Sequence, residues 1–274
     1  MKTVLTFLAS CIVAITATAQ AIADIEVSYT ASVPNFRTGK ADKTNQFILL
    51  ANSVESKFYS PATEYIDSLQ STPEGEAKYK EMSRSAYLGG KMNQMPRRDG
   101  QYYVVKSSTS GYMTCYDVNG LEKYRVEELL PQWEWQITDS TKSILGYECI
   151  LATTDFHGRE WNAWFSPDIP LANGPWKLGG LPGLILEANE SNGLYNFTAT
   201  GLQHSSRQIT PVYSAGDYEK IDRKDLLAAK RKFIDNPVSQ MNAQLSGLGI
   251  SISASANEIS HKSREEVDFI ETDY

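Results

Sequence analysis

The chain has 274 residues and a formal net charge of -7; 41% of its residues are hydrophobic and 22% are charged. This composition is typical of a globular protein and excludes the disordered, collagen-like and membrane-bundle classes. The acidic balance also argues against a general nucleic-acid-binding protein, because such a protein needs a basic surface to displace counterions from phosphate. Composition therefore limits the class of protein without specifying a reaction.

The first 23 residues have the layout of a secretory signal peptide. Lys2 is followed by the largely apolar run Val4–Ala14, and small residues allow cleavage after Ala19 or Ala23. A transmembrane anchor is the alternative, but it needs about 20 apolar residues, and this run is shorter. Leu8–Cys11 matches the sequence pattern of a lipoprotein cleavage box. Acylation at Cys11 would, however, leave an apolar region too short to be recognised well. We expect an exported protein of the periplasm or outer envelope, with no transmembrane segment in the mature chain.

The rest of the chain reads as strands with two helical regions. Residues 61–90 predict a helix pair broken near Pro73, and residues 222–247 predict helices broken at Asn236-Pro237. Period-two alternation and the turns Asn119-Gly120, His157-Gly158 and Asn192-Gly193 indicate antiparallel strands. The predicted strands cover residues 25–31, 46–51, 57–60, 102–106, 112–117, 121–126, 133–138, 147–154, 159–166, 184–188 and 194–200.

The domain organisation predicted from these patterns is simple. Residues 24–247 form a single β-rich α+β domain with accessory helices, because no linker or internal repeat interrupts them. Residues 248–274 are serine-rich and then charged, which is typical of a flexible tail.

Two cysteines, Cys115 and Cys149, remain after the signal peptide. Export places them where disulfides persist, so we expect a bridge between them. Two buried, unpaired thiols are the alternative. The chain has no CxxC motif, which argues against a redox-active pair.

A short motif gives the chain a family resemblance. Residues 180–185 read Gly180-Leu181-Pro182-Gly183-Leu184-Ile185, downstream of Trp133-Glu134-Trp135 and of Gly158-Arg159-Glu160-Trp161. This order, over about residues 25–240, resembles the GLPGLI family of secreted bacterial proteins. The resemblance implies an exported protein without an established reaction, so it carries over no catalytic residue. The strand and turn pattern is also similar to exported lipid-carrier folds, which implies a curved antiparallel sheet that wraps helices.

The motif itself has a physical interpretation. Gly180 and Gly183 flank Leu181-Pro182, so the chain can turn sharply there, and Leu184–Leu186 is a short apolar strand. We interpret the motif as a tight turn into a core strand. The alternative is a backbone loop held close to a ligand or partner.

Catalytic and metal-binding signatures are missing from the sequence. It has no GxSxG, HExxH, GxxxxGK[ST] or GxGxxG motif. Asp155, His157 and Glu160 lie around one turn and could meet a metal, but turns carry such residues for solvation. We therefore predict no catalytic residue, no metal and no cofactor.

The densest aromatic and cationic group provides the candidate ligand or partner surface: Arg159, Trp164 and Trp176. The alternative is a core built from Trp161 and Phe165, with Arg159 paired to an acid at the strand end.

These observations favour an exported, non-catalytic envelope protein that binds an apolar ligand or a protein partner. One alternative is an assembly factor that docks on an outer-membrane complex. The other is an unrecognised hydrolase that uses some of Asp155, His157, Glu160 and Asp168.

Overall fold

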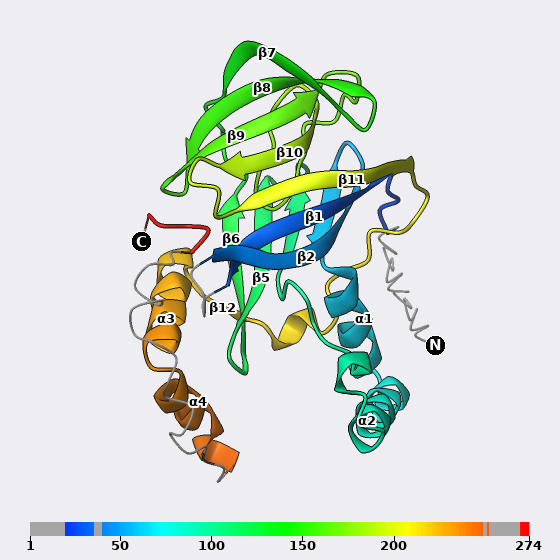
Figure 1. Ribbon diagram of the computed structural model, residues 1–274, viewed down its shortest axis with the longest axis vertical. Helices are drawn as coiled ribbons and strands as arrows, with labels where there is room; N and C mark the ends of the chain where they lie inside the picture. The colour runs from blue at the N-terminus through cyan, green and yellow to red at the C-terminus, as the bar shows by residue number, and fades with distance from the viewer. Residues whose placement is uncertain (1–19, 36–39, 249–250, 252–268, 274) are drawn as a thin grey trace, which may run out of the picture.

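A computed structural model of the protein describes residues 20–35, 40–248, 251 and 269–273. This part of the chain forms twelve strands and four α-helices (Figure 1). The strands are β1 (Ile25–Asn35), β2 (Lys40–Ala51), β3 (Glu55–Tyr59), β4 (Tyr103–Ser107), β5 (Tyr112–Asn119), β6 (Glu122–Leu129), β7 (Gln136–Ile144), β8 (Tyr147–Phe156), β9 (Arg159–Ser166), β10 (Leu184–Glu190), β11 (Asn196–His204) and β12 (Glu219–Lys220). The helices are α1 (Pro61–Gln70), α2 (Pro73–Leu88), α3 (Arg223–Asp235) and α4 (Pro237–Leu245), with short 3-10 turns at Met92–Gln94, Ala215–Asp217 and Ser246–Leu248.

All twelve strands belong to one sheet, in the order β12-β6-β5-β4-β3-β2-β1-β11-β10-β9-β8-β7. The two N-terminal strands are therefore central, and the chain builds one wing with β3 to β6 and the other with β7 to β11. Neighbouring strands pair antiparallel, except that β12 is parallel to β6. The predicted β-rich α+β class is confirmed, with the sheet mixed rather than wholly antiparallel.

The sheet curves so that its two wings enclose a common core. Cys115 on β5 and Ala152 on β8 belong to the same buried cluster, although seven strands (β4, β3, β2, β1, β11, β10 and β9) separate β5 from β8. The segment between β9 and β10 crosses this interior and contributes Trp176, Leu178 and Leu181 to the cluster. Aromatic contacts fill the centre, for example between the Trp161 and Trp176 rings, whose centroids lie 5.4 Å apart. The predicted curvature is therefore confirmed.

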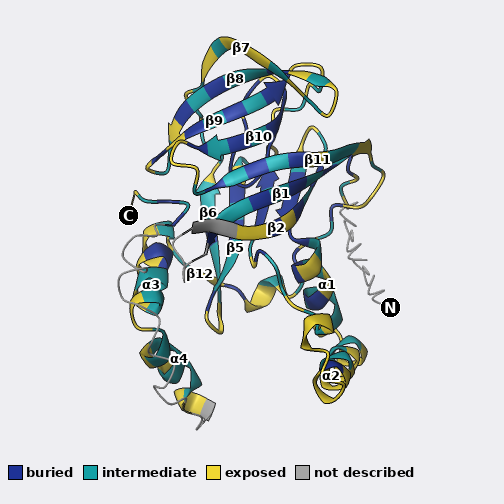
Figure 2. Ribbon diagram, viewed as in Figure 1, coloured by how far each residue is buried: buried dark blue, intermediate teal, exposed yellow. Residues whose placement is uncertain are grey.

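The helices flank this sheet rather than fill its interior. The predicted break at Pro73 is confirmed, because Ser60 caps α1 by accepting from the Thr63 amide and Thr72 caps α2 by accepting from the Gly75 amide. Figure 2 shows buried residues concentrated on the strands, whereas α2 and α4 are mostly intermediate or exposed. Among the described residues, no helix combines the length and apolar character needed to cross a bilayer.

The strand predicted at 133–138 is displaced in the structure, where β7 starts at Gln136 and continues to Ile144. The indole of Trp135 donates to the Gly179 carbonyl at 2.8 Å, and Trp133 lies against Gly180. The two tryptophans therefore pack residues 133–135 against the segment between β9 and β10, so these residues do not join the sheet. The two-residue strand β12 was not predicted, because its parallel pairing with β6 has no local sequence signal.

The prediction of a flexible tail over 248–274 needs correction at its end. Residues 269–273 pack on the domain, and both Phe269 and Glu271 are buried. Long-range ion pairs and hydrogen bonds, described below, hold this segment in place. Residues 249–250 and 252–268, like residues 1–19 of the predicted signal peptide, lie outside the described residues.

The predicted disulfide is not formed in this structure. Cys115 and Cys149 are both free and buried, which matches the alternative of two unpaired thiols. They lie on β5 and β8, in opposite wings of the sheet. The Cys149 thiol instead donates to the Tyr147 carbonyl oxygen at 3.7 Å.

Candidate functional site

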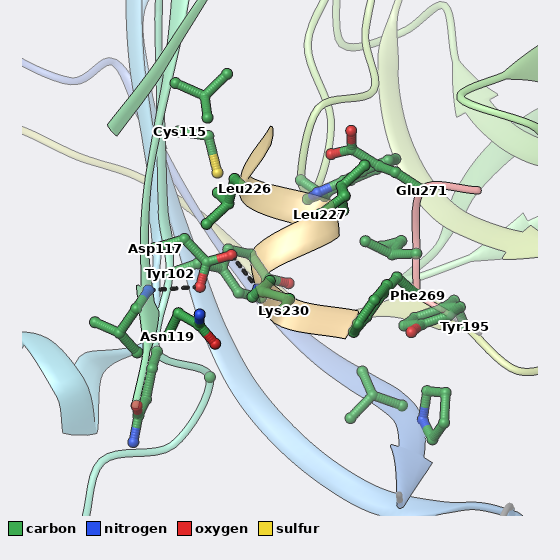
Figure 3. A pocket seen from close by; sticks show the side chains of 18 of the residues that line it. Tyr102, Cys115, Asp117, Asn119, Tyr195, Leu226, Leu227, Lys230, Phe269 and Glu271 are labelled. Carbon is green, nitrogen blue, oxygen red and sulfur yellow. Dashed lines mark hydrogen bonds and ion pairs between the residues drawn. The ribbon is translucent and has the colours of Figure 1, made fainter. Parts of the chain in front are cut away.

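A cavity of about 580 Å³ lies between α3, β5 and the C-terminal residues (Figure 3). Its walls are largely apolar: Leu226 and Leu227 come from α3, Cys115 from β5 and Phe269 from the C-terminal segment. Trp176 of the crossing segment also lines it. This volume and lining are typical of a site for a small molecule.

Helix α3 is held over the cavity by a contact of its own and by contacts of the following helix. Lys230 forms an ion pair with Asp117 on β5, as Figure 3 shows. In the following helix α4, Gln244 donates to the Asn119 carbonyl at 2.9 Å and accepts from the Leu121 amide at 2.9 Å. The helix pair is therefore fixed to the β5–β6 turn. Leu226 and Leu227 of α3 and Cys115 of β5 line the cavity between the two elements.

The cavity also has polar groups that a ligand could meet. The Asn45 side chain is only 4% exposed, and its Oδ1 atom has no hydrogen-bond partner among the described residues. A buried acceptor without a partner costs about 1–3 kcal/mol. The Asn45 Oδ1 atom has almost no accessible surface, so a ligand in the cavity would reach it only after a rearrangement of the neighbouring side chains. Lys43, which is exposed, adds a positive charge at the lining.

An ion-pair network closes one end of the cavity around Lys177, which is 2% exposed. Its Nζ atom lies 2.6 Å from Glu128 and 2.7 Å from Glu271. Burial acts to lower the pKa of Lys177, but the two carboxylates overcome it and raise that pKa above its usual value. Burial likewise acts to raise the pKa of Glu271, whereas Lys177, His157 and Arg223 hold it below the usual value. Both groups are therefore charged at neutral pH.

Arg223, at the first position of α3, extends this network. Its guanidinium lies 3.0 Å from Glu271, 3.3 Å from Glu128 and 2.6 Å from Asp273. His157 lies 3.4 Å from Asp273, and burial lowers the pKa of its imidazole.

The ligand atoms of His157, Glu271 and Asp273 lie within 4.8 Å of one another, which is a spacing that a metal ion could bridge. However, both carboxylates already bind Arg223, and Glu271 also binds Lys177. The geometry is therefore that of an ion-pair network. Asp155 and Glu160, which the sequence placed beside His157, are exposed and face each other across the hairpin.

Of the three residues predicted to form one binding surface, only Trp176 lines the cavity. Trp176 is 2% exposed and has a left-handed φ of 51°. Trp164 lies on the opposite face of β9, where the Lys142 ammonium covers its ring at 4.4 Å from the centroid. Arg159 is buried and pairs with Glu190 at 3.0 Å. The structure thus separates the three residues.

The structure matches the alternative prediction for strand β9, which is that its aromatic residues form part of the core. Trp161 and Phe165 are buried in the core, and Arg159 is paired to an acid. Arg159 also reaches the cavity indirectly, because its guanidinium donates to the carbonyl oxygen of Phe269 at 3.0 and 2.5 Å.

The GLPGLI motif forms a tight turn into the buried strand β10, as interpreted from the sequence. Gly180 has a φ of 81° and lies against Trp133, while a Cβ atom at Gly183 would lie 2.1 Å from the Ser166 carbonyl oxygen. Leu184 and Ile185 are fully buried, and the Tyr29 hydroxyl donates to the Ile185 carbonyl at 2.6 Å. Four residues of the motif are thus buried, whereas Gly180 and Pro182 remain exposed.

The residues of the hydrolase alternative do not converge. Asp155 and Glu160 lie at the β8–β9 turn, whereas Asp168 follows the other end of β9 and is exposed. The remaining candidate, His157, contacts Glu128, Glu271 and Asp273.

The sequence interpretation missed the residues that shape the site. Leu226, Leu227 and Asp117 were recognised only as parts of a helix and a strand, and Phe269 and Glu271 were assigned to a flexible tail. The apolar pair Phe269-Ile270 within a charged segment was the one sequence signal that these residues pack on the domain.

Comparison with known proteins gives one family and a set of solved structures. The profile of the family described as "N-glycanase peptide, N-terminal domain" matches residues 92–230. Structures of PNGF-II in the C2 and P21 space groups are both 17% identical, with a TM-score of 0.49. They align with 78% and 77% of this chain, which spans only about a third of their length, 33% and 34%. No curated protein matches the chain.

Proposed function

Because the family match extends over 139 of 274 residues, the chain belongs to the family described as "N-glycanase peptide, N-terminal domain", and we propose that it is an exported, non-catalytic binding protein. Its binding site is the cavity beneath α3, and its ligand is largely apolar. The residues of the hydrolase alternative do not converge on one site, and we therefore assign the chain a binding role.

The observation that carries this proposal is the cavity itself. Elsewhere the interior of the curved sheet is filled by side chains of the crossing segment, such as Leu178 and Leu181. Beneath α3, by contrast, Leu226, Leu227 and Phe269 line a cavity, and Asn45 belongs to the same lining. Largely apolar walls with polar side chains such as Lys43 and Asn45 at their edge suit a ligand that has an apolar body and a polar group.

Export is the second part of the proposal, and the signal peptide predicted from the sequence supports it. Residues 21–23 belong to the fold: the Ala23 amide donates to Arg207 O at 2.8 Å, and Ala21 O accepts from the Ile209 amide at 2.8 Å. Cleavage after Ala23 would remove these contacts, so we expect cleavage after Ala19. N-terminal sequencing of the exported protein should begin at Gln20; a start at Asp24 would contradict this expectation.

The resemblance to the GLPGLI family remains part of the proposal. It is supported by the position of residues 180–185, whose two glycines allow close contact with Trp133 and with the Ser166 carbonyl. An apolar segment of a partner protein is the other occupant that the cavity could accept.

The cavity can be tested with N-phenyl-1-naphthylamine, an uncharged apolar fluorophore. Leu226→Trp fills the space beneath α3, and Leu129→Trp makes the same change at a residue that is 69% exposed and outside the lining. We expect saturable binding to the wild-type protein, binding at least tenfold weaker to Leu226→Trp, and unchanged binding to Leu129→Trp. Equal binding by Leu226→Trp, with a wild-type circular dichroism spectrum, would contradict the proposed site.

A further inference from the structure

The C-terminal segment Phe269–Asp273 is bound to the domain in the way that a peptide ligand is bound. Its backbone makes directional contacts with the β8–β9 turn: the Thr272 amide donates to the His157 carbonyl at 2.9 Å. The Thr272 hydroxyl donates to the Gly158 carbonyl, also at 2.9 Å. At the other end of the segment, the Phe269 carbonyl accepts from Arg159. These contacts recognise an extended backbone at two points.

The side chains of the segment are recognised by charge and by an aromatic contact. Glu271 binds Lys177 and Arg223, and Asp273 binds Arg223 through two hydrogen bonds of 2.6 and 2.8 Å. The Phe269 ring lies 4.8 Å from the Arg231 guanidinium and is buried at the wall of the cavity. We call the group that receives these residues the cationic socket; it consists of Glu128, His157, Gly158, Arg159, Lys177, Arg223 and Arg231.

The socket is charge-complementary to an acidic peptide. Without the segment, Glu128 would be the one carboxylate among the described residues that binds both Lys177 and Arg223. Lys177 is nearly completely buried, and a buried charge that loses a partner is strongly destabilised. The socket therefore needs carboxylates from outside the sheet and α3, and Glu271 with Asp273 supplies them.

We propose that the cationic socket is a peptide-recognition site for an acidic segment of the pattern Phe-x-Glu-x-Asp. Residues 269–273 are its resident ligand, and an acidic segment of the same pattern in a partner protein displaces them. Displacement also removes Phe269 and Ile270 from the wall of the cavity. The peptide site stands on its own contacts, whether or not the cavity holds a small molecule.

The direct test uses a chain that ends at Asp268 and an acetylated peptide of residues 269–274. We expect isothermal titration calorimetry to show one peptide bound per chain. The matched control peptide carries Glu271→Gln and Asp273→Asn, which keep size and shape while they remove both charges. It should bind at least tenfold more weakly. Equal binding of the two peptides, or no binding to a folded truncated chain, would overturn the proposal.

A second variant keeps the test decisive if the truncated chain does not fold. In the full chain, Glu271→Gln with Asp273→Asn weakens the resident segment but leaves its backbone contacts available. We expect this variant to bind the wild-type peptide at least tenfold more tightly than the wild-type chain does, because the resident segment no longer competes effectively. Equal affinities of the two full-length chains would show that the segment is not exchangeable and would overturn the proposal.

Discussion

Two buried lysines show how differently the crossing segment and the cavity edge are built. Lys106 on β4 holds the crossing segment by donating to Asn173 Oδ1 at 3.1 Å and to the carbonyls of Gly174 and Leu178 at 3.2 and 2.5 Å. No carboxylate of the described residues pairs with it, and burial lowers its pKa to about 7. Lys177, at the edge, is held by two carboxylates.

The surroundings of Lys106 are a permanent part of the fold, whereas part of the surroundings of Lys177 can be removed. The acceptors of Lys106 belong to the core and cannot leave without unfolding it. One carboxylate of Lys177, that of Glu271, belongs to residues 269–273, which contact the domain through the ion pairs and hydrogen bonds described above. Stability in the first region depends on packing, whereas stability in the second depends on whether the acidic segment is present.

The largest expected effect comes from removal of the charge at the cavity edge. Lys177→Met leaves the buried carboxylate of Glu271 without one of its partners, and we expect a loss of about 3–5 kcal/mol in the free energy of unfolding. Lys106→Met removes a charge that no carboxylate accompanies, so we expect a smaller loss of about 1–2 kcal/mol. Urea denaturation of both variants measures the difference. Lys80→Met, at a residue whose side chain is 72% exposed, is the control and should change stability by less than about 0.5 kcal/mol.

The close packing of the GLPGLI motif can be tested with a substitution in its turn. Gly183→Ala would place a Cβ atom 2.1 Å from the Ser166 carbonyl oxygen, so the backbone of β9 or β10 has to move. We expect a loss of about 2–3 kcal/mol by urea denaturation. Gly216→Ala is the control, because no atom lies within 4 Å of its added Cβ. A Gly183→Ala protein as stable as the control would contradict the close packing of the motif.

The smallest effect is a pH dependence that separates the two lysines. The folded-state pKa of Lys106, about 7, lies below its ordinary value of 10.5, so between these values the unfolded chain binds more protons than the folded chain. Stability should therefore rise from pH 7 to pH 8.5, a window that lies below the ordinary pKa of cysteine. Lys106→Met should flatten this rise, and Lys177→Met should keep it, because the pKa of Lys177 is raised. Thermal unfolding at several pH values measures both slopes, and a rise that persists in Lys106→Met would contradict the assignment.

Local patterns predicted much of the fold. The break at Pro73 and the turn at Asn119-Gly120 lie where the sequence places them, because proline and glycine restrict or permit the backbone regardless of distant contacts. The alternation of Trp161, Ala163 and Phe165 against Trp164 is also confirmed, since it depends only on the period of a strand.

The candidate site was far less predictable, because it depends on residues that are distant in sequence. Lys177 and Glu271 are 94 positions apart, and no local rule connects them. The expected disulfide failed for the same reason, since the two cysteines lie in opposite wings of the sheet. Trp176 lines the cavity because the crossing segment runs through the interior of the curved sheet. The residues next to Trp176 in the sequence do not reveal this path.

The central claim is that the cavity beneath α3 holds an apolar ligand, and native mass spectrometry tests it most directly. The protein should be purified gently from the cells that naturally make it, beside the Leu226→Trp variant produced in the same cells. We predict one small molecule bound per wild-type chain and its loss from Leu226→Trp. A folded wild-type chain that carries no small molecule, or a variant that retains it, would contradict the claim.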